Sequence, residues 1–177
     1  MGQFTWALKN KDISDLGVTA IILSLCCYFA YDVEAIHRIA GFLICQQGIE
    51  GNWLPNESPS AVDYTFETTY LVLEAFLQCG TRYAIAEDPA LSSGVQKGQK
   101  FLLRHNIGLG EQGPIKSKWA SFSFPSYWFY DILTSLDYFC AFRMNKDKGI
   151  EAAIDLLRQR QTEDGIWILA RVYHPQA

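Results

Sequence analysis

Two acidic residues stand at matching places in the chain and are the first candidates for chemistry. Glu67 follows Phe66 and Asp131 follows Tyr130, and each precedes an apolar run at helical spacing. Carboxylates in a desolvated cavity take up raised pKa values and can act as general acid and base, for example in glycoside hydrolysis. We therefore expect Glu67 and Asp131 to face one cavity, and they are the candidate catalytic residues of this chain. The alternative is that both are solvated or cap a neighbouring helix.

Aromatic side chains are concentrated near both acidic residues. We expect them to line the same cavity, where aromatic faces attract cations, with ligand-binding roles for Phe66, Tyr70, Phe124, Tyr127, Trp128 and Tyr130. Such a cavity would favour a cationic or hydroxylated ligand over an anionic diphosphate. Ordinary packing between helices is the alternative use of these residues.

Metal and thiol chemistry have little basis in the sequence. The three histidines are scattered without an HExxH pattern, and the five cysteines contain no CxxC pair. We expect no metal site and no cofactor. Cys26, Cys27, Cys45 and Cys140 fall in apolar helical patterns and are expected to pack as core thiols, whereas Cys79 is expected at a helix end.

The composition describes an ordinary globular domain. The 177 residues are 49% hydrophobic, carry a formal net charge of -4 and contain no basic run. Nucleic acid and a polybasic membrane anchor are therefore not expected as partners. The most apolar run, residues 18–31, is shorter than the roughly 20 residues that span a bilayer, and acidic residues precede it where a signal peptide would be basic. These features favour a cytoplasmic protein with no transmembrane segment.

Apolar residues recur at helical spacing along the chain, and no segment alternates as a strand does. Turn signals separate six expected helices, arranged as three hairpins, near residues 18–31, 36–44, 62–77, 89–105, 128–140 and 150–157. We expect an all-α fold. Residues 1–177 should form a single α/α-repeat domain, either complete or a fragment of a longer protein.

An internal repeat is the most specific pattern in the chain. Leu43-x3-Gln47-x3-Gly51-x-Trp53 recurs 114 residues later as Leu157-x3-Gln161-x3-Gly165-x-Trp167, and a partial copy midway ends at His105. In this pattern glycine ends a helix, glutamine binds free backbone groups and tryptophan covers the turn. We interpret these residues, His105 included, as structural rather than catalytic, and expect both tryptophans to be largely buried.

The order of helix, glutamine, short turn and Gly-x-Trp resembles the QW repeat of the terpenoid cyclases, of which squalene-hopene cyclase is typical. Residues 68–74 and 124–133 are also similar to segments of small bacterial proteins with prenyltransferase/squalene-oxidase repeats. The resemblance implies the α/α toroid that this family shares with the protein prenyltransferase β subunits. Its toroids contain more than three hairpins, so three imply a fragment, an open horseshoe or a ring completed by other copies. The exposed ends of an open stack favour a homo-oligomer.

The catalytic motifs of that family are missing. Its cyclases protonate an alkene with a DxDD tetrad, and here only Glu67 stands at the matching place; neither a DDxxD magnesium cluster nor the prenyltransferase zinc ligands have a counterpart. We therefore predict a noncatalytic module that binds an apolar, isoprenoid-like molecule or a partner helix in a concave aromatic cavity. One alternative is a terpenoid cyclase-like enzyme that uses Glu67 or a DxDD in a missing portion. Another is a ring-forming subunit without a ligand.

Overall fold

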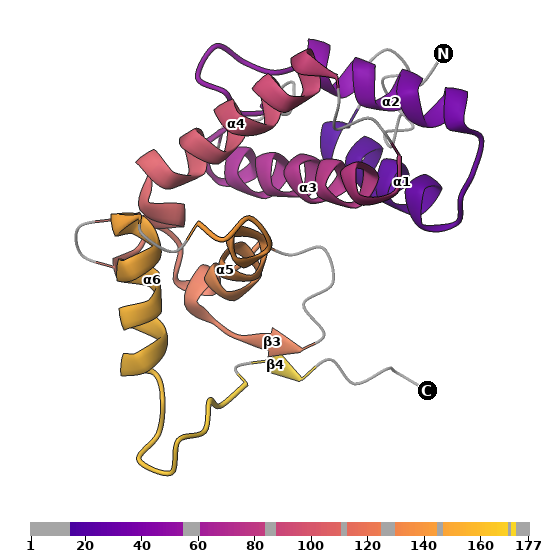
Figure 1. The fold of residues 1–177 in the computed structure, drawn as a ribbon. Helices are drawn as coiled ribbons and strands as arrows, with labels where there is room; N and C mark the ends of the chain where they lie inside the picture. Colours follow the sequence, from indigo (N-terminus) through magenta and orange to yellow (C-terminus); the bar gives the residue numbers. More distant parts are fainter. Residues whose placement is uncertain are drawn as a thin grey trace, which may run out of the picture. The chain divides into compact units, whose positions relative to one another are not determined.

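The computed structural model describes residues 15–54, 61–83, 88–110, 113–124, 130–144, 147–169 and 171–172 (Figure 1). Within these residues the six α-helices are α1 (Leu16–Tyr28), α2 (Val33–Cys45), α3 (Ala61–Arg82), α4 (Pro89–Arg104), α5 (Ile132–Ala141) and α6 (Lys148–Gln159). The expected all-α fold is confirmed. The chain forms two compact units, residues 1–101 and 102–177. The toroid arrangement of the repeats stays a prediction.

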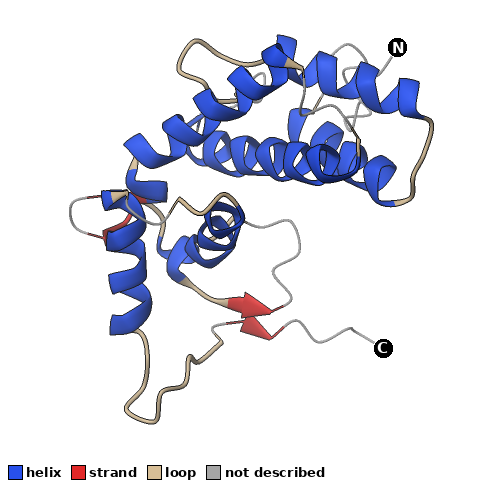
Figure 2. Ribbon diagram, in the orientation of Figure 1, coloured by secondary structure: helices blue, strands red, loops and turns tan. Residues whose placement is uncertain are grey.

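The described strands are short (Figure 2). β1 (Leu109–Gly110) pairs antiparallel with β2 (Gly113–Pro114), and β3 (Ser123–Phe124) pairs in parallel with β4 (Arg171–Val172). Two 3-10 helices, η2 (Asn106–Gly108) and η3 (Ser117–Ala120), lie between α4 and α5. Strands of two residues are too short to show alternation, which is why the sequence gives no strand signal.

Aspartates fix the start of several helices. The side chain of Asp15 accepts a hydrogen bond from the backbone N–H of Val18 at 2.9 Å, and that of Asp147 from Gly149 at 2.8 Å. These bonds satisfy amide groups that have no partner inside the helix. α4 begins in a similar way, since the Asp88 side chain accepts from the backbone N–H of Ala90 at 2.8 Å. Its first residue is Pro89, a first-turn position where the missing N–H of proline costs no hydrogen bond.

In the first unit α1 packs along α3, and a disulfide joins the two helices. Cys27 and Cys79 are both buried, with a Cα–Cα distance of 5.6 Å. The expectation of a core thiol is therefore wrong for Cys27, because Cys79 lies opposite it on α3. It is also wrong for Cys45 and Cys140, which lie on the exposed sides of α2 and α5.

The most apolar segment forms a helix, as expected, but its far end is not buried. α1 ends at Tyr28, and the aromatic residues Tyr28, Phe29 and Tyr31 are exposed at the turn into α2. The chain turns sharply there, since Ala30 has a positive φ of 52°. Among the described helices, none combines the length and the apolar character that a membrane span requires.

The second unit is built around Trp119 and Tyr130. Their rings pack edge to face with centroids 5.1 Å apart, and the Tyr130 hydroxyl donates a hydrogen bond to the carbonyl of Ile107 at 2.8 Å. Gly108 has a φ of 87°, and a Cβ on it would lie 2.7 Å from the Trp119 ring. Only glycine fits at this point, so the connection between α4 and α5 depends on it.

Candidate functional site

The first copy of the repeated motif forms a closed network of hydrogen bonds, here called the covered turn (residues 47–54). The Gln47 side-chain amide donates to the carbonyl of Gly51 at 2.8 Å, and Gly51 takes up a φ of 88°. The indole Nε1 of Trp53 donates to the carbonyl of Leu43 at 2.6 Å. Glycine is needed because its left-handed backbone lets the chain reverse directly after the helix.

The second copy, here called the open turn (residues 161–169), forms the same network. The Gln161 amide donates to the carbonyl of Gly165 at 2.9 Å, and Gly165 has a φ of 79°. The indole Nε1 of Trp167 donates to the carbonyl of Leu157 at 2.8 Å. The repeated spacing in the sequence therefore produces the same local structure twice.

The covered turn lies under α4. The Gln47 amide also donates to the carbonyl of Gly94 at 2.8 Å, and a Cβ on Gly51 would lie 2.5 Å from the carbonyl oxygen of Lys97. A Cβ on Gly98 would lie 2.9 Å from the Trp53 ring. As a result the Trp53 side chain is 0% exposed, which confirms the expectation that it is buried.

The open turn has no such cover from the described residues. Trp167 is 44% exposed, so the expectation that it is largely buried is wrong. Among the described residues other than its chain neighbours, only the Nε2 of Gln161 would lie within 4 Å of a Cβ on Gly165, at 3.6 Å. The physical reason is that the motif fixes the turn itself but does not supply the helix that packs on it. Exposed apolar neighbours extend the surface, namely Ile166, Ile168 and Leu169.

The partial copy ends differently. His105 is exposed directly after α4, and the left-handed glycine that follows is Gly108 rather than a residue four positions after the histidine. Trp119, which is fully buried, covers this connection. Gly108 and Trp119 therefore form a glycine turn covered by a tryptophan, as Gly51 and Trp53 do, but with a longer loop between glycine and tryptophan.

Asp131 is the N-cap of α5. Its carboxylate accepts a hydrogen bond from the backbone N–H of Thr134 at 2.7 Å, and the Thr134 hydroxyl lies 3.2 Å from the backbone N–H of Asp131, from which it accepts. The residue is buried, and desolvation raises the pKa of its carboxyl above the ordinary value despite the opposing hydrogen bonds from Thr134. The raised pKa is as expected, and the helix-cap alternative applies to Asp131.

Glu67 lies in the first unit, half-buried on α3 between Phe66 and Thr68. Asp131 belongs to the second unit. That the two carboxylates share a cavity, or act as a catalytic pair, stays a prediction.

The predicted ligand-binding aromatics lie mainly in packed positions where the structure describes them. Phe66 is buried against Phe101 with ring centroids 5.4 Å apart, and Tyr130 is buried against Trp119. Tyr70 is half-buried on α3. Tyr127 and Trp128, and the side chain of Phe124, lie outside the described residues. Phe66 and Tyr130 therefore serve ordinary core packing.

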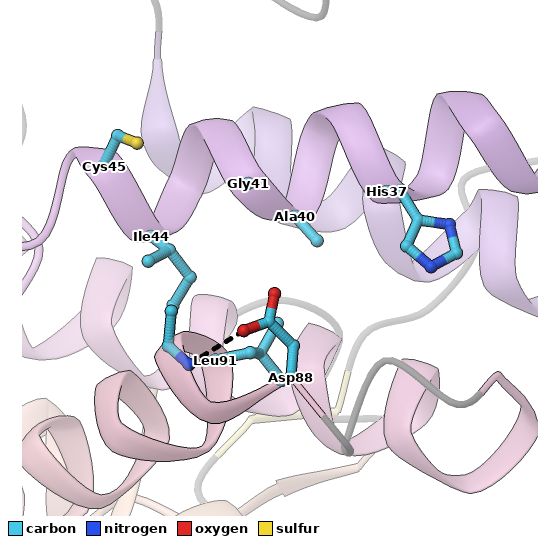
Figure 3. Close-up of a pocket in the computed structure, with 8 residues that line it drawn as sticks. His37, Ala40, Gly41, Ile44, Cys45, Asp88 and Leu91 are labelled. Carbon is cyan, nitrogen blue, oxygen red and sulfur yellow. Dashed lines mark hydrogen bonds between the residues drawn. The ribbon is translucent and has the colours of Figure 1, made fainter.

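A small pocket lies between α2 and the start of α4 (Figure 3). Its volume is about 260 Å³, and it is lined by His37, Ala40, Gly41, Ile44, Cys45, Asp88, Ala90 and Leu91. His37 Nδ1 lies 2.8 Å from the carbonyl of Val33, and the Asp88 carboxylate accepts from the backbone N–H of Ala90 at 2.8 Å. The volume is below the roughly 300 to 1,000 Å³ of typical small-molecule sites, so the pocket gives little room for an isoprenoid chain.

Sequence reasoning missed the exposed surface of the open turn. The available signal was the run Ile166-Trp167-Ile168-Leu169, four large apolar residues in succession after a tight turn.

Within the part of the chain that the structure describes, no cluster of three or more histidine, cysteine or acidic side chains is placed to hold a metal ion. Comparison of the chain with known protein families, with curated proteins and with solved structures finds no match.

Proposed function

We propose that this chain is a noncatalytic α/α-repeat module that binds a partner helix at the open turn. The observation that carries the proposal is the difference between Trp53 and Trp167. The two indoles make the same hydrogen bond to their own helices, but α4 covers only Trp53. The proposed binding site is therefore the surface around Trp167 and not the concave aromatic cavity expected from the sequence.

The residue types at the open turn suit a binding surface. A contiguous apolar patch on a protein surface marks an interaction site, and tryptophan is enriched among the residues that dominate binding energy. The ring of Trp167 is already held by its bond to the carbonyl of Leu157, so little side-chain freedom would be lost on binding. A partner helix would therefore gain apolar contact at low entropic cost.

The resemblance of the repeat to the QW repeat of terpenoid cyclases supports a scaffold of stacked hairpins, which fits a module that accepts a further helix. The expectation of a homo-oligomer is one form of the same proposal, in which the helix comes from a second copy. Cyclase-like catalysis through Glu67 has no specific support from the geometry around that residue.

A display selection tests the proposed function. A yeast-displayed library of helical peptides is selected on the labelled full chain, with counter-selection on the Trp167→Ala variant. Because Trp167 is 44% exposed, this variant should remain folded. The matched control is Ile49→Ala, which removes a fully exposed apolar side chain from the covered turn.

Peptides that bind the chain and the Ile49→Ala variant equally, and the Trp167→Ala variant weakly, would support the proposal. A selection in which no peptide distinguishes Trp167→Ala from the unaltered chain would show that the open turn is not a helix-binding site.

A further inference from the structure

We propose that the partner helix of the open turn carries two small residues four positions apart, with a basic residue directly before the second. This is the pattern Gly94-x2-Lys97-Gly98 that α4 presents to the covered turn. The inference rests on the proposed function and adds the chemistry by which the partner is recognised. α4 serves as the template because the two turns share their internal hydrogen bonds.

The second small residue is required by the tryptophan ring. A Cβ on Gly98 would lie 2.9 Å from Cζ3 of Trp53 and 2.9 Å from Cδ2 of Leu73, closer than carbon atoms pack. Trp167 is held by the equivalent hydrogen bond, to the carbonyl of Leu157. A helix that lies on Trp167 at this distance therefore needs glycine where the ring meets it.

The glutamine side chain supplies a polar contact to the same helix. The amide nitrogen of Gln47 donates twice, to its own turn at Gly51 and to the carbonyl of Gly94 on α4. A side-chain amide has two N–H donors. Gln161 makes the first of these bonds, to Gly165, and is exposed. Its second donor is placed to bind a carbonyl of the partner helix.

The first small residue is less strictly required than the second. A Cβ on Gly94 would lie 2.5 Å from Cδ1 of Ile44, and the residue at the position of Ile44 in the second copy is Arg158. The Arg158 side chain is exposed and paired with Asp155 at 2.9 Å. A long, exposed side chain can move aside, so a larger residue at this position of the partner should weaken binding less than one at the second position.

Charge accounts for the basic residue. Where the covered turn has Ile49 and Glu50, the open turn has Glu163 and Asp164, both exposed. Lys97 lies directly at the turn, since a Cβ on Gly51 would be 3.0 Å from its Cβ. A basic residue at this position of the partner would lie beside two carboxylates of the open turn, and this favours association.

Peptides with the sequence of α4 itself test the inference. A labelled peptide of residues 88–105 is titrated with the full chain and binding is followed by fluorescence anisotropy. We expect Gly98→Leu in the peptide to weaken binding about tenfold or more, and Gly94→Leu to weaken binding least of the three substitutions. Lys97→Glu should also weaken binding, by a larger factor at low salt than at high salt. Leucine favours helix more than glycine does, so a loss with Gly98→Leu cannot come from a less helical peptide.

Variants of the chain locate the binding site. Trp167→Ala and Gln161→Ala should each weaken binding of the parent peptide, whereas Ile49→Ala should leave it unchanged. The inference is overturned if the parent peptide does not bind, if Gly98→Leu binds equally well, or if Trp167→Ala has no effect on the parent peptide. Should the display selection then yield helices without the small-residue pair, the proposed function would stand and only the recognition pattern would fail.

Discussion

Gln47, two residues after the end of α2, donates a hydrogen bond from its side-chain amide to the carbonyl of Gly94 on α4, 47 residues later in the chain, at 2.8 Å. This bond joins a turn, which is formed by residues close together in the sequence, to a helix that lies far away in the sequence. The side-chain amide of Gln161, at the same place in the second copy, donates only to its own turn within the described residues. The two copies are therefore a natural comparison between the same turn with and without a covering helix.

The two tryptophans should differ in their contribution to stability. Trp53→Ala removes a fully buried ring and should cost about 3 to 5 kcal/mol of unfolding free energy. Trp167→Ala removes one hydrogen bond and a partly exposed ring, and should cost only about 1 kcal/mol. Urea unfolding of the two variants measures both values. Equal losses would mean that Trp167 is covered in solution.

The sequence predicts those parts of the fold that depend on neighbouring residues. Helical spacing predicts α2, α3, α4 and α6, and the motif predicts both turns, because their hydrogen bonds span only four to ten residues. The start of α5 can also be predicted from the sequence, since Asp131 and Thr134 have the spacing of a capping box. The aromatic residues before Asp131 favour a cavity, whereas the spacing of Asp131 and Thr134 favours this cap.

Contacts between distant residues could not be predicted in the same way. Cys27 and Cys79 are 52 residues apart, and helical periodicity does not say which cysteine faces which. Likewise, nothing in the spacing of the motif says that α4 covers Trp53 while Trp167 is left exposed. Both properties follow from how helices pack, which the pattern of one helix does not determine.

The disulfide should contribute strongly to stability. It closes a loop of 52 residues, for which chain entropy gives about 4 kcal/mol. Replacing Cys27 and Cys79 together by alanine should lower the unfolding free energy by about this amount, with a further loss from the cavity, whereas Cys140→Ala, at an exposed free cysteine, should change it little.

Alkylation in denaturant gives an independent check of the disulfide. Without a reductant iodoacetamide should label three cysteines, Cys26, Cys45 and Cys140, and after reduction it should label five. Five labels without reduction would show that the disulfide does not form in the purified chain. Because disulfides are rare in the reducing cytoplasm, the same assay on freshly lysed cells also tests the expected location.

The titration of Asp131 should make stability depend on pH. Burial raises the pKa of this carboxyl in the folded chain, so the folded state binds the proton more tightly than the unfolded state. The resulting stabilisation is fully present below the unfolded pKa of about 3.9 and is lost as the pH rises through the raised folded value.

Asp131→Asn isolates this effect, because asparagine also caps helices but does not titrate. Relative to the variant, the unaltered chain should become less stable as the pH rises above the unfolded pKa of about 3.9 and through the raised folded value, as measured by urea unfolding at each pH. Asp131→Ala serves as the control, since it should lose about 1 kcal/mol of capping energy even where the carboxyl is protonated. A constant difference between Asp131→Asn and the unaltered chain over this range would contradict the raised pKa.

The turn glycines offer the sharpest test of what α4 does. Gly51 and Gly165 have φ values of 88° and 79°, so alanine at either position carries the same strain of about 1 to 2 kcal/mol. Only at Gly51 would the new Cβ also meet backbone, 2.5 Å from the carbonyl oxygen of Lys97. Gly51→Ala should therefore be less stable than Gly165→Ala by a further 1 to 3 kcal/mol or so, the cost of overpacking. The difference in unfolding free energy between the two variants, measured in urea, tests whether α4 packs against the covered turn. If both variants lose the same stability, α4 does not pack on the covered turn, and it is then no template for a partner of the open turn.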